Sequence, residues 1–132
     1  MLDKFSPHFF AHPGIVTHSS GNHGQAVAYA SSIAALPSIV VVTKNTPKVK
    51  ARLRRRIHLA FPLITIAFLQ TSAIEGYGAE VVKCDTSPSS RVEVCKKIAE
   101  EKPGFKMVPS SDHVDVIAGQ GTIALELHEQ VT

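Results

Sequence analysis

A short β-branched run meets an amphipathic segment through a turn of small polar residues, and this junction constrains the fold of the 132-residue chain most strongly. Residues 15–18, together with Gly14, are predicted to form a buried strand, and the hydrophobic spacing over residues 25–36 predicts a helix. Glycines flank the polar turn at residues 19–24 (SSGNHG). Such a turn directs the free N–H groups and the positive dipole end of the helix toward the end of the strand. The junction therefore predicts a site for a carboxylate or a phosphate.

The alternation of strand and helix continues along the chain. Further strands are predicted at residues 39–43, 79–84 and 105–108. The first of these (IVVVT) is a continuous β-branched run, which is typical of a parallel strand covered on both faces. Helices are predicted after Thr46-Pro47, from Ser90 to about Glu101, and within residues 115–130. The order predicts an α/β domain of three layers around a mostly parallel four-stranded sheet.

Two of these helices carry local signals for their starts. Ser90 with Glu93 three residues later forms a capping-box pattern. The last helical region is expected to follow a glycine-rich turn that contains Gly119 and Gly121. A chain of this length supports a single core, so we expect an irregular leader over residues 1–13 and one domain over residues 14–132.

Charge and cysteine content narrow the class of protein. The formal net charge is +3, but residues 48–56 alone carry six positive charges, so the rest of the chain has a net charge of −3. Basicity is local, and we expect no nucleic-acid partner. Cys84 and Cys95 form no CxxC pair, and the chain shows no secretory leader, which favours a reducing cytoplasmic setting. His8 and His12 are followed by Pro13 and predict no metal site.

An atypical segment interrupts the domain at about residues 51–71. A basic run is followed by thirteen mostly apolar residues, 57–69, which are too few for a membrane span of about 20 residues. We expect no membrane insertion. Because its residue types are encoded largely by pyrimidine-rich codons, we hypothesise that residues 51–70 are a retained-intron or gene-model artefact rather than a real insertion. Transcripts that consistently retain the segment would refute this hypothesis.

Residues 17–26 (THSSGNHGQA) resemble the asparagine loop of the fold-type II pyridoxal phosphate enzymes. His23 favours the serine racemase and serine/threonine dehydratase branch, because the cysteine and cystathionine synthases usually carry threonine there. Two further stretches, 71–85 and 116–126, are similar to later segments of that family in the same order. The resemblance implies the small α/β domain of these enzymes, which are usually homodimers.

The resemblance also implies roles for the loop residues. The loop Ser19, Ser20, Gly21, Asn22 and His23 would bind the substrate carboxylate, and Asn22 would hydrogen-bond the phenolic oxygen of pyridoxal phosphate. Ser20 matches the serine that acts as acid and base on one face of Cα in the racemase. Its alternative role is a turn hydroxyl that satisfies the start of the helix.

Three residues outside the loop match further sites of the family. Arg91 matches the arginine that engages the distal group of the ligand, although a solvated arginine at a helix start is the alternative. Gln25 and Tyr77 match positions that line a nucleotide effector site, which implies ATP as a possible effector.

One element of the family is missing from the sequence. No stretch matches the Ser-x-Lys-x-Arg-Gly segment that supplies the Schiff-base lysine, since Lys4 has the wrong neighbours. We therefore expect a truncated, inactive fragment of a serine racemase or an L-serine/L-threonine ammonia-lyase. Two alternatives stay open: a non-catalytic amino-acid (carboxylate) binding or regulatory module, and a small anion-binding α/β protein unrelated to the family.

Overall fold

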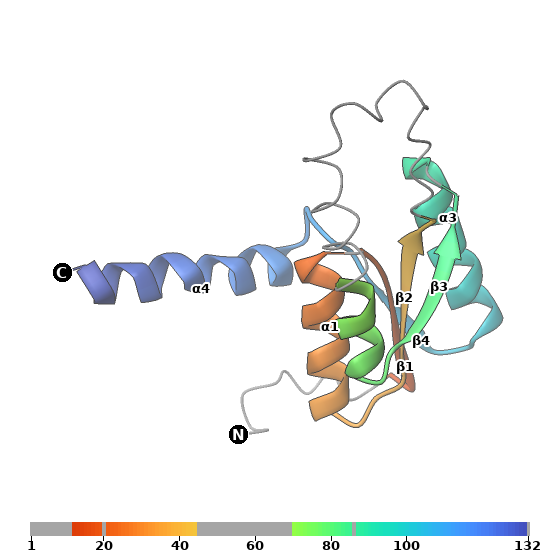
Figure 1. The fold of residues 1–132 in the computed structure, drawn as a ribbon, viewed down its shortest axis with the longest axis horizontal. Coiled ribbons are helices and arrows are strands. Elements are labelled where there is room, and N and C mark those ends of the chain that lie inside the picture. The colour runs from red at the N-terminus through yellow and green to blue at the C-terminus, as the bar shows by residue number, and fades with distance from the viewer. Residues whose placement is uncertain (1–11, 20, 45–69, 86, 132) are drawn as a thin grey trace, which may run out of the picture.

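A computed structural model describes residues 12–19, 21–44, 70–85 and 87–131 of the chain (Figure 1). The predicted leader up to residue 11, the start of the helix expected after Thr46-Pro47 and residues 51–69 of the atypical segment lie outside these ranges. Ser20 lies outside them too. The predictions made for these residues therefore stay predictions.

The sheet consists of four parallel strands, as the sequence predicted. They are β1 (Gly14–His18), β2 (Ser38–Thr43), β3 (Glu80–Cys84) and β4 (Phe105–Val108). Their order in the sheet is β3-β2-β1-β4, and every neighbouring pair is parallel. Parallel pairing brings the carboxyl ends of all four strands to one edge of the sheet.

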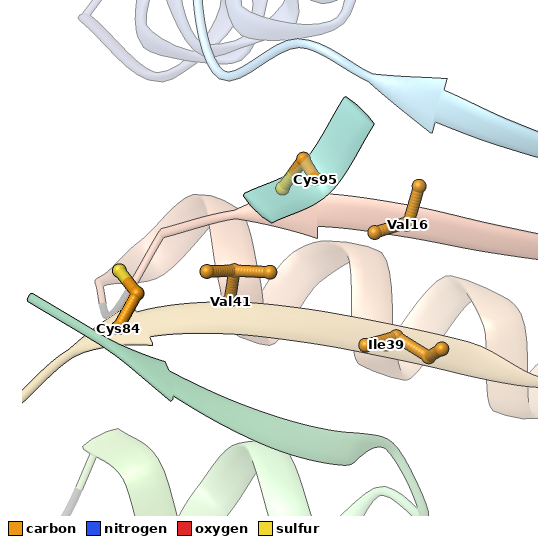
Figure 2. Packing of buried hydrophobic residues seen from close by; sticks show 5 residues of the cluster. All are labelled: Val16, Ile39, Val41, Cys84 and Cys95. Carbon is orange, nitrogen blue, oxygen red and sulfur yellow. The ribbon is translucent and has the colours of Figure 1, made fainter. Parts of the chain in front are cut away.

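Side chains of β2 show why the sheet needs cover on both faces. Ile39 and Val41 belong to one buried cluster, together with Cys95 of α3 (Pro88–Glu101). Figure 2 shows Cys95 above the strands that carry Val16 and Val41. Val40 and Val42 belong to a second cluster with residues of α1 (Asn22–Ile33) and of the helical residues 70–76. The two clusters confirm a three-layer α/β architecture.

Helix α1 begins and ends three residues earlier than the sequence predicted. Its carboxyl end is closed by hydrogen bonds from the N–H groups of Ala35 and Leu36 to the carbonyls of Ser32 and Ser31, at 3.2 and 2.9 Å. Ala35 has a φ of 53°, so an alanine occupies the left-handed position that glycine usually fills at a helix end. The hydrophobic spacing continues to residue 36, but the backbone leaves the helical conformation after Ile33.

Helix α3 begins at Pro88, so the predicted capping box at Ser90 and Glu93 is wrong. The N-cap is Ser87, whose Oγ accepts a hydrogen bond of 3.1 Å from the N–H of Ser90. Proline suits the first helical position, because its φ is already helical and its missing N–H is not needed there. The Ser-Pro pair therefore starts the helix upstream of the box.

Helix α4 (Val114–Val131) runs through the region where a glycine-rich turn was expected. Neither Gly119 nor Gly121 has a positive φ, and a Cβ at either position would meet open space. The backbone therefore stays helical. The helix extends away from the sheet (Figure 1) and buries no residue. Its exposed apolar side chains are Val114, Ile117, Ile123, Leu125, Leu127 and Val131.

Among the described residues, no helix combines the length and the apolar character that crossing a bilayer requires.

Candidate functional site

The turn of interest lies where the sheet topology changes direction. From β1 the chain passes through α1 to β2, and from β3 it passes through α3 to β4 on the other side of β1. Helices α1 and α3 cover opposite faces, and the connections that leave β1 and β3 run in opposite directions along the sheet, so the topology switches beside β1. Ligands of open parallel sheets bind in the crevice at such a point. Ser19 and Gly21, which belong to the segment between β1 and α1, lie there.

A close backbone contact shapes this turn. A Cβ on Gly24 would collide with the carbonyl oxygen of Ser19, so the turn folds directly onto the first turn of α1. The N–H of Gly21 donates to Oγ of Ser19 at 3.2 Å. Only glycine fits at position 24 without moving the loop.

The amino end of α1 has no side-chain cap. Its N-cap is Gly21, and the first turn contains no acidic residue. The first N–H groups of an α-helix have no acceptor within the helix, and they carry the positive end of the helix dipole. Asn22 is exposed at this end and His23 is half-buried. The described part of the turn therefore offers backbone N–H donors to an anion.

Below the turn, a buried hydroxyl links β1, β4 and α1. Thr17 is fully buried, and its Oγ1 donates a hydrogen bond of 2.7 Å to the carbonyl of Val108. Nε2 of His23 lies 3.0 Å from the same Oγ1. Partial burial lowers the pKa of His23, and His18 adds to this effect, while the carbonyl of Val108 opposes it. The imidazole of His23 is therefore neutral near pH 7.

The guanidinium of Arg91 acts on the same edge of the sheet from α3. The pKa of His18, at the end of β1, is lowered first by burial and then by the charge of Arg91. Nε of Arg91 is buried and has no hydrogen-bond partner among the described residues. A buried N–H without an acceptor is costly. A bound acidic group would remove this cost.

The structure brings most of the predicted ligand-binding residues together. Ser19, Gly21, Asn22 and His23 form the turn, and Arg91 approaches it through the end of β1. The position of Ser20 lies outside the described residues.

The predicted nucleotide-site residues lie on α1 and beside it. Gln25 is half-buried on α1, and Tyr29 lies one turn further along the same helix. Tyr77 packs its ring against that of Tyr29, with centroids 5.3 Å apart. Gln25 and Tyr77 therefore lie along one face of α1.

Sequence reasoning assigned no role to Thr17 or His18, which the structure places in the site. A threonine in an otherwise apolar buried strand was the available signal for Thr17, because a buried hydroxyl needs partners. His18 carried a similar signal as a polar residue at a strand end.

The chain has relatives with established names. A model of the family described as "Pyridoxal-phosphate dependent enzyme" matches residues 7–132. Serine racemase of Homo sapiens is 40% identical over 117 residues, which are 89% of this chain and 28% of that protein. The L-threo-3-hydroxyaspartate ammonia-lyase of Saccharomyces cerevisiae is 33% identical over 118 residues, 89% of this chain and 30% of that protein.

A solved structure has the same fold. The crystal structure of a pyridoxal 5'-phosphate-dependent aspartate racemase matches with a TM-score of 0.71 and 46% sequence identity, over 92% of this chain and 30% of that one. The chain thus spans less than a third of the length of these relatives.

Proposed function

Because this chain belongs to the family of pyridoxal-phosphate dependent enzymes, we propose that it forms the amino-acid-binding part of a serine racemase or an L-serine/L-threonine ammonia-lyase. The observation that carries the proposal is the uncapped amino end of α1 at the topological switch point. In the same region, the buried Nε of Arg91 has no hydrogen-bond partner among the described residues. Both features suit a ligand with acidic groups.

Each residue of the site has a role in this proposal. The N–H groups at the start of α1 and the hydroxyls of Ser19 and Ser20 hold the carboxylate of the amino acid. The guanidinium of Arg91 binds the distal group of the ligand. Asn22 hydrogen-bonds the phenolic oxygen of pyridoxal phosphate. Ser20 exchanges a proton with one face of Cα. Its match to the serine that has this role in the racemase supports the assignment.

Pyridoxal phosphate, when bound, supplies the electron sink that makes the proton on Cα removable. The part left to these residues is to hold the amino acid so that the Cα–H bond is correctly oriented and to exchange its proton. Racemisation and ammonia loss both need the carboxylate of the amino acid to be bound in the same way. The loop therefore supports both reactions equally.

The proposal further holds that these 132 residues do not turn over substrate by themselves. The sequence contains no match to the family's Schiff-base lysine segment. Incubation with pyridoxal phosphate, L-serine and borohydride is expected to give no stoichiometric lysine adduct, no pyruvate and no D-serine. Denatured chain serves as the control for nonspecific lysine labelling. Labelling at one lysine together with turnover would contradict this part of the proposal.

A non-catalytic module that binds amino-acid carboxylates is the second candidate. It is supported by the composition of the described site, in which carboxylate-binding groups are assembled. Calorimetric titration with L-serine should then give a saturable heat that the Arg91→Gln variant weakens. Lys97→Gln is the matched control, since Lys97 is exposed on the same helix and forms an ion pair with Glu101 at 3.8 Å. An absence of saturable heat would reject this candidate.

A nucleotide effector, a homodimer and a reducing cytoplasmic setting complete the proposal. Gln25 and Tyr77 would contact ATP, and the free, buried Cys84 and Cys95 suit a reducing compartment. Tyr29 and Tyr77 are the chain's two tyrosines, so tyrosine ring resonances report this region alone. ATP should shift those resonances and Gln25→Ala should weaken the shift, whereas unchanged resonances would remove the effector from the proposal.

A further inference from the structure

The buried hydroxyl of Thr17 has two polar neighbours of different character. The carbonyl oxygen of Val108, 2.7 Å from Oγ1, can only accept a hydrogen bond. A hydroxyl carries one hydrogen, and at this distance that hydrogen must point at the carbonyl, because two bare oxygens would otherwise face each other. The hydroxyl hydrogen of Thr17 is therefore committed to Val108.

This commitment decides the proton position on His23. Nε2 lies 3.0 Å from Oγ1, which now offers only lone pairs in that direction. If Nε2 were unprotonated, two lone pairs would meet beside a fully buried residue. Nε2 must therefore carry the hydrogen and donate it to Thr17.

The other ring nitrogen follows from the charge state. Burial, and then the proximity of His18, lower the pKa of His23, so the ring carries one proton near pH 7. Arg91 is the charged group that acts on His18 from α3, and β4 contributes the carbonyl of Val108. With the single proton on Nε2, Nδ1 has a free lone pair.

We infer that Thr17 is a positioning residue, which holds His23 in the Nε2–H tautomer and makes its side chain a hydrogen-bond acceptor in the amino-acid site. Resting on the proposed function, this assigns the ring to a donor on the ligand, the ammonium or hydroxyl group of a β-hydroxy amino acid. The carboxylate is left to the N–H groups of α1 and the serine hydroxyls, and the distal group accepts from Arg91. The side chain of His23 therefore has a different role from the rest of its loop, which binds the carboxylate.

The tautomer is measured on the complete 132-residue chain, labelled with ¹⁵N-histidine, by long-range ¹H–¹⁵N correlation at pH 7.5 without ligand. His23→Gln identifies the signals of His23. We expect a protonated Nε2 and an unprotonated Nδ1 in the wild type and in Thr17→Ser, which keeps the hydroxyl. Thr17→Val has the same shape without the hydroxyl and should show a mixture of both tautomers. A wild-type His23 with its proton on Nδ1 overturns the inference.

The Thr17→Val result is read only against a folded protein, and the wild-type and Thr17→Ser spectra decide the question if that variant fails to fold. A folded Thr17→Val chain with an unchanged tautomer also overturns the positioning role.

Adding L-serine separates this inference from the proposed function. A shift of the Nδ1 resonance on binding supports the acceptor role, and binding that leaves Nδ1 unmoved overturns it. If L-serine does not bind at all, the proposed function and the acceptor role fail. The hold of Thr17 on the tautomer is judged from the ligand-free spectra alone.

Discussion

The absence of a side chain at Gly24 shapes the candidate site directly. Its Cα lies so close to the backbone of Ser19 that a Cβ would strike the carbonyl oxygen, and a backbone atom cannot rotate away as a side chain can. The loop and the first turn of α1 therefore keep their geometry through a single missing methyl group.

The Gly24→Ala variant is expected to lose about 1–3 kcal/mol of unfolding free energy, the usual cost of overpacking a tight site. Gly76→Ala is the matched control, because a Cβ there meets open space and its φ is not positive. Urea denaturation measures both. Equal effects of the two substitutions would mean that the loop does not need glycine at position 24.

Two histidines give the folded state a defined response to pH. Burial is the largest cause that lowers the pKa of both His18 and His23, and Arg91 and His18, respectively, act in the same direction. A histidine whose pKa is lower in the folded state binds protons more readily when unfolded. The contribution of these histidines to the free energy of unfolding is therefore fully present above the unfolded pKa of about 6.5, and it is lost as the pH falls below that value.

We expect the urea midpoint to decrease between pH 7.5 and pH 5.5, and the decrease to be smaller in the double variant His18→Gln/His23→Gln. Both side chains are partly exposed, so solvent reduces the size of the effect. An identical pH dependence in the double variant would assign the acid sensitivity to other groups.

At the scale of elements, the predicted ends of the strands were more accurate than the predicted ends of the helices, because the residues at a helix end determine where the helix starts and stops. The strands were predicted to within one residue, because their short runs end at turn residues. Helix α3 started earlier than predicted because Ser87-Pro88 competes with the capping box at Ser90, and hydrophobic spacing does not distinguish these two starts. Glycine at positions 119 and 121 likewise looked like a turn, although neither backbone needed one.

The cap of α3 can be tested with two serines. Ser87→Ala removes the oxygen that accepts from the N–H of Ser90 and should cost about 1 kcal/mol of unfolding free energy. Ser90→Ala keeps that N–H and should stay within about 0.5 kcal/mol of the wild type. Thermal or urea unfolding compares them. A larger loss in Ser90→Ala would restore the capping box as the helix start.

At the scale of the whole molecule, the parallel sheet and the position of the loop followed from the alternation of strands and helices. The approach of Arg91 to His18 and the link from Thr17 to Val108 and His23 did not, because they join residues from separate elements. Such contacts depend on crossover geometry, which a linear pattern does not contain. Family resemblance selected Arg91 for its role, but the burial of its Nε, without a hydrogen-bond partner in the described part of the chain, became visible only in three dimensions.

The central claim is that the start of α1 binds the carboxylate, and Arg91 the distal group, of an amino acid joined to pyridoxal phosphate. Its most direct test is a backbone ¹H–¹⁵N titration of the 132-residue chain with N-phosphopyridoxyl-L-serine, the stable reduced conjugate. The account predicts saturable shifts at the N–H groups of Gly21, Asn22, His23 and Gly24, which Arg91→Gln weakens and Lys97→Gln does not. Shifts confined to other parts of the chain, or no shifts at all, would contradict it.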